Sequence, residues 1–193
     1  MQCESVLEAD LAWILDACPG VTAFGEQAAA LGYRHDNDLR WHVPDFAVWT
    51  DEGLMFVEVK FSRDVCPGVR ERTTRLQGLL HPYQIGYRLV TETDIREGAA
   101  LGNAQKLLVR ARVQPSGIWS AQACDEVRRR CSVPLSDFSW SISGSEAAAS
   151  IARLIIDGHL RLDMSRDITA STQVYQSPAL IQENRLWLPE AFK

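Results

Sequence analysis

Three ionisable residues lie inside two apolar segments, VPDFAVW at 43–49 and LMFVEVKF at 54–61: Asp45 in the first, Glu58 and Lys60 in the second. Two carboxylates at one spot raise each other's pKa unless a cation lies between them. Oxygen ligands suit Mg²⁺ or Mn²⁺ better than zinc. An adjacent ammonium group could act on a phosphate or on an attacking water. The pattern therefore predicts a divalent metal site with a lysine beside it.

Two neighbouring strands must position these residues. Alternation along a strand places Glu58 and Lys60 on one face and their apolar neighbours on the other. Pro44 lacks a backbone donor and suits a strand edge or a distortion. If a hairpin closes around residues 52–53, Asp45 comes close to Glu58, and we expect the two segments to be antiparallel partners.

The surrounding segments predict an α/β core within residues 1–115. Apolar residues at helical spacing, followed by Cys-Pro-Gly at 18–20, predict a helix over 5–17. The next segment, 21–34, is expected to hold one or two strands, and a polar loop at 35–38 leads into the strand pair, RWHVPDFAVW at 40–49 and LMFVEVKF at 54–61. Further elements are a helix over 69–80, a strand over 87–92 and a helix over 99–112. This order predicts a mixed sheet flanked by helices.

Residues 116–193 show a different pattern. A helix is expected through the run Arg128–Arg130, and another between Ser145 as N-cap and Gly158 just beyond its end. Two short strands are expected in HLRLDM and ITASTQVY. The order predicts a small winged-helix-like appendage.

Composition favours an ordinary globular protein. The 193 residues are 46% hydrophobic and 23% charged, and no apolar run is long enough to span a bilayer. The N-terminus lacks the basic-then-apolar order of a secretory signal, so we expect a cytoplasmic protein that is not in a membrane. The five cysteines have no zinc-like spacing and are expected to be free thiols.

The residues around Asp45 resemble a nuclease motif. Pro44-Asp45, twelve intervening residues and Glu58-Val59-Lys60 resemble the PD-(D/E)XK motif, whose family has a restriction-endonuclease-like core. Together with Ser5-Val-Leu-Glu8 and DACPGVTAFGEQ, the order over residues 4–110 is similar to the TnsA-type transposon endonucleases.

The resemblance implies a Mg²⁺- or Mn²⁺-dependent endonuclease that hydrolyses a phosphodiester at transposon ends. It implies that Glu8, Asp45 and Glu58 are metal ligands and that Lys60 is the catalytic lysine. Glu4 and Asp10 stay open as alternatives to Glu8, because Glu4 lies one helical turn before it and Asp10 is also nearby.

The implied partners are double-stranded DNA, a transposase subunit and an ATPase regulator. Four arginines that follow the motif are candidate DNA contacts: Arg63, Arg70, Arg72 and Arg75. The net charge of −5 argues against a broad grip on the phosphate backbone by this chain alone. Binding to DNA is therefore expected to be weak and salt-sensitive, with specificity supplied by a partner.

Ordinary explanations compete with each assignment. Glu8 three residues after Ser5 fits a capping box, Glu58 and Lys60 fit the wet face of a strand, and Asp45 fits a turn. The histidines, His42 included, are expected to be packed or surface residues. Two other functions remain open: a restriction or defence nuclease that acts without a transposase, and a binding module that does no chemistry.

Overall fold

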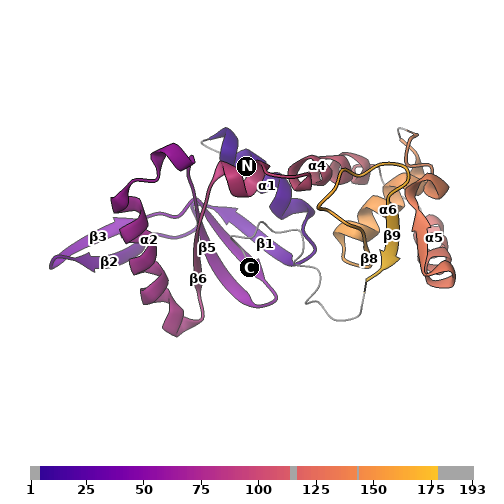
Figure 1. Ribbon diagram of the computed structural model, residues 1–193. Helices are drawn as coiled ribbons and strands as arrows, with labels where there is room; N and C mark the ends of the chain where they lie inside the picture. Colours follow the sequence, from indigo (N-terminus) through magenta and orange to yellow (C-terminus); the bar gives the residue numbers. More distant parts are fainter. Residues whose placement is uncertain (1–4, 114–116, 143, 178–193) are drawn as a thin grey trace. The chain divides into compact units, whose positions relative to one another are not determined.

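A four-stranded mixed sheet carries the predicted site. The computed structural model describes residues 5–113, 117–142 and 144–177. The sheet has the order β1-β4-β5-β6, and its strands are β1 (Val21–Glu26), β4 (Phe46–Thr50), β5 (Gly53–Val59) and β6 (Gly86–Val90). β1 and β5 are both antiparallel to β4, whereas β6 is parallel to β5 (Figure 1). The predicted mixed sheet and its β4–β5 hairpin are therefore confirmed.

The register of β4 on β5 fixes where the acids lie. Phe46 pairs with Val57, and Thr50 pairs with Gly53 at the turn. The next residues along each strand are Asp45 and Glu58, so the hairpin brings these two positions opposite each other, as predicted.

The predicted strand over 40–49 is interrupted. Residues 43–45 separate β4 from an earlier strand, β3 (Asp38–His42), and β3 pairs with β2 (Leu31–His35) instead of joining the sheet. The two-residue turn of this second hairpin, Asp36-Asn37, has positive φ at both positions, as a tight type I′ turn requires. The prediction of one continuous strand was wrong, because Pro44 lacks the backbone donor that a continuing ladder would need.

Helix α2 (Pro67–Leu80) lies between the β2–β3 hairpin and β6 (Figure 1). It begins with proline at its first turn, where the missing N–H costs nothing. Its Leu76 joins a buried cluster with Ala47, Phe56 and Tyr87 from the sheet. Leu31 and Tyr33 of the hairpin pack against the same cluster, so the inner face of the hairpin is anchored to the core.

The remaining elements of this part are α1 (Val6–Ala17), α3 (Glu92–Arg96) and two 3₁₀ turns, Ser62–Asp64 and His81–Tyr83. Apolar residues of α1 are fully buried, namely Leu7, Leu11, Ile14 and Leu15. The predicted first helix and its end at residues 18–20 are confirmed.

Contacts divide the described residues into two units: 5–12 and 21–97 in one, and 13–20, 98–113, 117–142 and 144–177 in the other. By contacts the division falls at 97–98, and α4 (Ala100–Ala111) packs against a later helix, α6 (Glu146–Ile156). The domain boundary expected at 115–116 stays a prediction. The side chain of Asn103, fully buried on α4, hydrogen-bonds three backbone groups between residues 164 and 168.

The second unit also contains α5 (Gly117–Arg130) and a three-stranded antiparallel sheet. The strands are β7 (Ser132–Pro134), β8 (Leu160–Arg161) and β9 (Gln173–Gln176), in the order β7-β9-β8, and a 3₁₀ turn spans Leu135–Phe138. The predicted cap of α6 is confirmed: the Ser145 side chain accepts a hydrogen bond from the Ala148 N–H, and Gly158 follows the helix with a φ of 77°.

The described residues include no helix that is long and apolar enough to cross a bilayer. Four cysteines lie in this part of the chain, and all four are free thiols, as predicted: Cys18, Cys66, Cys124 and Cys131.

Candidate active site

Glu58 is the centre of a buried polar network. It lies near the end of β5, and its side chain is only 3% exposed. One carboxylate oxygen, Oε1, accepts from Lys60 Nζ at 3.0 Å and from the Arg72 guanidinium at 2.8 Å. The other, Oε2, lies 2.6 Å from His42 Nε2. The predicted pairing of Glu58 with Lys60 on one strand face is therefore present.

Two members of this network, His42 and Tyr87, were not assigned to the site from the sequence, and a third, Arg72, was predicted only as a DNA contact. His42 ends β3, Arg72 comes from α2, and the hydroxyl of Tyr87 on β6 lies 2.8 Å from His42 Nε2 and 3.4 Å from Glu58 Oε2. His42 is half-buried and packs beside the Tyr87 ring, but its contact with Glu58 was not foreseen. Burial, followed by the negative charge of Glu58, raises the pKa of Tyr87, so this hydroxyl stays protonated.

Basic partners hold Glu58 in its ionised form. Burial alone would raise its pKa, but hydrogen bonds and positive charge from His42 and Lys60 outweigh burial and lower the pKa from 4.5 to about 2. A carboxylate held this way is fully ionised at neutral pH.

Asp45 lies in the opposite electrostatic situation. It sits in the loop between β3 and β4, where its Oδ2 accepts a hydrogen bond from the Val59 N–H at 2.6 Å. Its pKa is raised from 3.8 to about 6. Burial is the main cause and the negative charges of Glu58 and Glu8 act in the same direction, whereas the Val59 hydrogen bond and the charge of Lys60 lower the pKa. Asp45 is thus an acid whose negative charge is incompletely balanced by the protein.

The helix acids can now be distinguished. The Glu8 N–H donates to Ser5 Oγ at 3.1 Å, so Ser5 caps α1, yet the carboxylate of Glu8 still acts on Asp45. Asp10 instead forms a 2.7 Å ion pair with Arg96. Glu4 lies outside the described residues. Of the two alternatives within the described residues, Glu8 is the one whose charge raises the pKa of Asp45.

The acids of this site are not equally suited to bind a divalent cation. Within the described ranges, no three His, Cys, Asp or Glu side chains form a group arranged to hold a metal ion. Asp45 suits a cation, because added positive charge would offset the burial and the repulsion by Glu58 and Glu8 that raise its pKa. Glu58 already has both carboxylate oxygens in contact with basic groups. Asp45 with Glu8 is therefore the better-fitting pair.

The four arginines predicted to contact DNA have different environments. Arg72 is bound to Glu58 and is 25% exposed. Arg75 pairs with Glu71 at 3.2 Å and donates to the Arg34 carbonyl at 3.3 Å. Arg63 lies 5.0 Å from the Phe61 ring centroid. Arg70 is exposed on α2.

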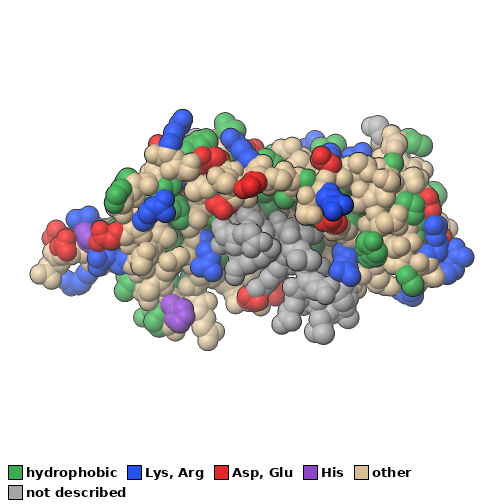
Figure 2. Space-filling view, viewed as in Figure 1, with side chains coloured by type: hydrophobic (Ala, Val, Ile, Leu, Met, Phe, Trp, Pro, Cys, Tyr) green, Lys and Arg blue, Asp and Glu red, His purple; other side chains and the backbone are tan. Residues whose placement is uncertain are grey.

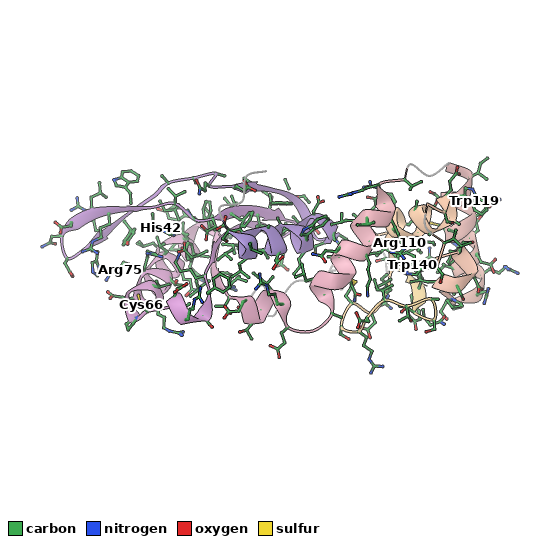
Figure 3. The ribbon with its side chains drawn as sticks, turned by 90° about the horizontal axis from the view of Figure 1, so that it is seen from above. His42, Cys66, Arg75, Arg110, Trp119 and Trp140 are labelled. Carbon is green, nitrogen blue, oxygen red and sulfur yellow. The ribbon has the colours of Figure 1, made fainter. Side chains whose placement is uncertain are left out.

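The hairpin and α2 bring these groups together at one end of the first unit. Figure 3 places His42 and Arg75 between the β2–β3 hairpin and α2, with Cys66 at the start of that helix. Basic and acidic side chains are interspersed over the same elements in Figure 2.

The run Arg128–Arg130 in α5 is paired locally with Asp125, Glu126 and Asp137.

The lowered pKa of Glu58 predicts a loss of stability in acid. The folded pKa, about 2, lies below the ordinary value of 4.5, so the ionised form stabilises the fold above pH 4.5. This stabilisation is expected to disappear as the pH falls from 4.5 through about 2. Urea unfolding across this range should show a steeper fall for the wild type than for Glu58→Gln. Parallel curves for the two proteins would show that Glu58 is not held as an ion.

The chain matches no protein-family model, and no curated protein matches it in sequence.

Proposed function

We propose that this protein is a metal-dependent DNA endonuclease that hydrolyses phosphodiesters. One observation carries the proposal: Asp45, an acid with incompletely balanced charge, lies opposite a buried Glu58 that is bonded to Lys60. An under-compensated carboxylate beside a fixed acid and lysine is an arrangement suited to binding a cation and a phosphate together.

Asp45 and Glu8 would hold Mg²⁺ or Mn²⁺, with Glu58 as a further ligand. The ion supplies a more acidic bound water and neutralises charge on the phosphate. Lys60 is 33% exposed, so its ammonium can reach a phosphate while Glu58 holds it in position. His42 and Arg72 keep the Glu58 carboxylate fixed and ionised.

Replacement of Lys60 by alanine tests the catalytic role. Nicking of supercoiled plasmid with Mg²⁺ or Mn²⁺ is expected to fall by at least about 100-fold, because the charge next to the reacting phosphate is lost. Lys106→Ala is the matched control: this lysine, on α4, pairs with Asp167 in the second unit. Equal nicking by Lys60→Ala and the wild type, or no nicking by the wild type even with its partners, would reject the catalytic assignment.

The biological setting is proposed to be transposition. We place the chain as a TnsA-like subunit in the cytoplasm that acts with a transposase and an ATPase regulator. A stand-alone restriction or defence nuclease is the alternative with the same chemistry. Co-purification with a transposase and an ATPase distinguishes the two settings.

One observation favours a binding module without chemistry. Both carboxylate oxygens of Glu58 already contact basic groups, from His42, Lys60 and Arg72. Such a network can contribute to stability without any role in catalysis. The two readings differ at Asp45: a purely structural site has no use for an acid held at a raised pKa, whereas a metal site does.

For the second unit we propose a winged-helix-like architecture. Its order of α5, β7, a 3₁₀ turn, α6, β8 and β9, with the sheet order β7-β9-β8, supports this proposal. In such folds the helix before the two wing strands often contacts DNA. Here α6 has most of its residues buried and packs against α4 and α5. We therefore propose that this unit binds a protein partner and does not read DNA through α6.

A further inference from the structure

A small basic pocket lies between the inner face of the β2–β3 hairpin and α2. Its volume is about 80 Å³. Hairpin and helix each contribute to its lining: Tyr33, His35 and Arg40 from the hairpin, and Gly68, Glu71, Arg72 and Arg75 from α2.

The pocket continues the candidate active site. Arg40 precedes His42 by two residues on β3, so both side chains share the inner face of the hairpin, and Tyr33 is the cross-strand partner of Arg40. Across the gap, Arg72 lines the pocket and also donates to Glu58. A group bound in the pocket would therefore be one side chain away from the network that holds Lys60.

The charges of the pocket favour an anion. Three arginines line it, and Glu71 is its single acid. Glu71 contacts Arg75 at 3.2 Å and His35 at 3.6 Å, which holds both at the rim. The Arg72 guanidinium forms an ion pair with Glu58, but its Nε is buried and has no hydrogen-bond partner among the described residues. A buried unpaired donor is costly unless a ligand satisfies it.

Arg40 is the group most available to a ligand. Its side chain is exposed and forms no ion pair or hydrogen bond with the described part of the chain. Planar guanidinium groups are well suited to bind phosphate through two parallel hydrogen bonds.

We propose that this pocket binds a backbone phosphate of the DNA strand, next to the phosphate that is cleaved, with Arg40 as its principal ligand. The inference rests on the proposed endonuclease function and extends it by naming how the substrate is positioned. Binding of one phosphate in this pocket, instead of many over a broad surface, agrees with the weak DNA binding expected for a chain of negative net charge.

The hairpin offers a matched control. Arg34 is also an exposed arginine of the hairpin. Unlike the next residue, His35, it does not line the pocket. Its position on β2 alternates with Tyr33 and His35, so its side chain lies on the outer face. Glu71 provides a change in the opposite direction, since it is the acid of the pocket.

The test measures binding of the full-length protein to a short DNA duplex without divalent metal, by fluorescence anisotropy from low to moderate salt. Arg40→Gln is expected to weaken binding about tenfold at low salt. It should also reduce the slope of log affinity against log salt by about one, the signature of one lost phosphate contact. Glu71→Gln is expected to tighten binding, and Arg34→Gln to leave the affinity and slope nearly unchanged.

Three results would contradict the proposal that this pocket binds a DNA phosphate. Equal losses in Arg40→Gln and Arg34→Gln would show a general charge effect, and wild-type behaviour of Arg40→Gln would show that the pocket holds no phosphate. No binding by the wild type at low salt would also overturn it. Plasmid nicking by the wild type and by Lys60→Ala tests the endonuclease proposal separately, so the two failures remain distinguishable.

Discussion

Asp45→Asn is expected to abolish metal-dependent DNA cleavage and at the same time to make the protein more stable at neutral pH. The pKa of Asp45 is raised from 3.8 to about 6, so ionising it above pH 6 costs folding free energy. Asparagine removes that charge and can still accept the hydrogen bond from Val59. After allowance for partial solvent screening, we expect a gain of about 1 to 2 kcal/mol.

The sign of the effect depends on pH. A raised pKa means that stability is fully present below the ordinary value of 3.8 and is lost as the pH rises through about 6. Urea unfolding of Asp45→Asn and wild type should therefore agree near pH 3.5 and diverge at pH 8. Asp51→Asn, an exposed acid in the β4–β5 turn, should show no such divergence. A variant that is less stable than wild type at pH 8 would contradict the unbalanced charge of Asp45.

Glu58→Gln is expected to destabilise the protein by about 3 kcal/mol at pH 7. The substitution preserves size but removes the negative charge shared by His42, Lys60 and Arg72, and leaves these basic groups close together without a counter-charge. Breaking a buried charge network in this way is among the costlier single changes.

Urea unfolding measured by circular dichroism checks this loss. Glu71→Gln is the matched control, because this α2 carboxylate is 58% exposed and pairs with Arg75. Its removal should change the free energy of unfolding by no more than about 0.5 kcal/mol. Similar losses for both variants would mean that the network around Glu58 does not contribute specially to the fold.

The sequence was sufficient for most of the elements and for the strand pair that carries the site. The apolar runs around Asp45 and Glu58 are long and strongly patterned, so their pairing and the placement of Lys60 beside Glu58 followed from alternation alone. Helix caps such as Ser145 were also recognisable, because they depend on residues close together in the sequence.

The partners of Glu58 depend on contacts distant along the chain. Arg72 and Tyr87 lie 14 and 29 residues after Glu58, and no local pattern indicates which arginine or tyrosine will meet it. His42 was the one accessible signal. It lies two residues after Arg40 and therefore shares its strand face, and β3 ends at His42, just before Val43-Pro44. The packing of α4 against α6 is another contact between distant segments that no local pattern indicates.

The metal site itself is tested most directly by a crystal structure of the protein with Mn²⁺, located by its anomalous scattering. Our account predicts an ion about 2.1 Å from a carboxylate oxygen of Asp45, with Glu8 as a second ligand. A protein that crystallises with Mn²⁺ but shows no ion at Asp45, or binds it only at unrelated surface acids, would contradict the proposed hydrolytic site.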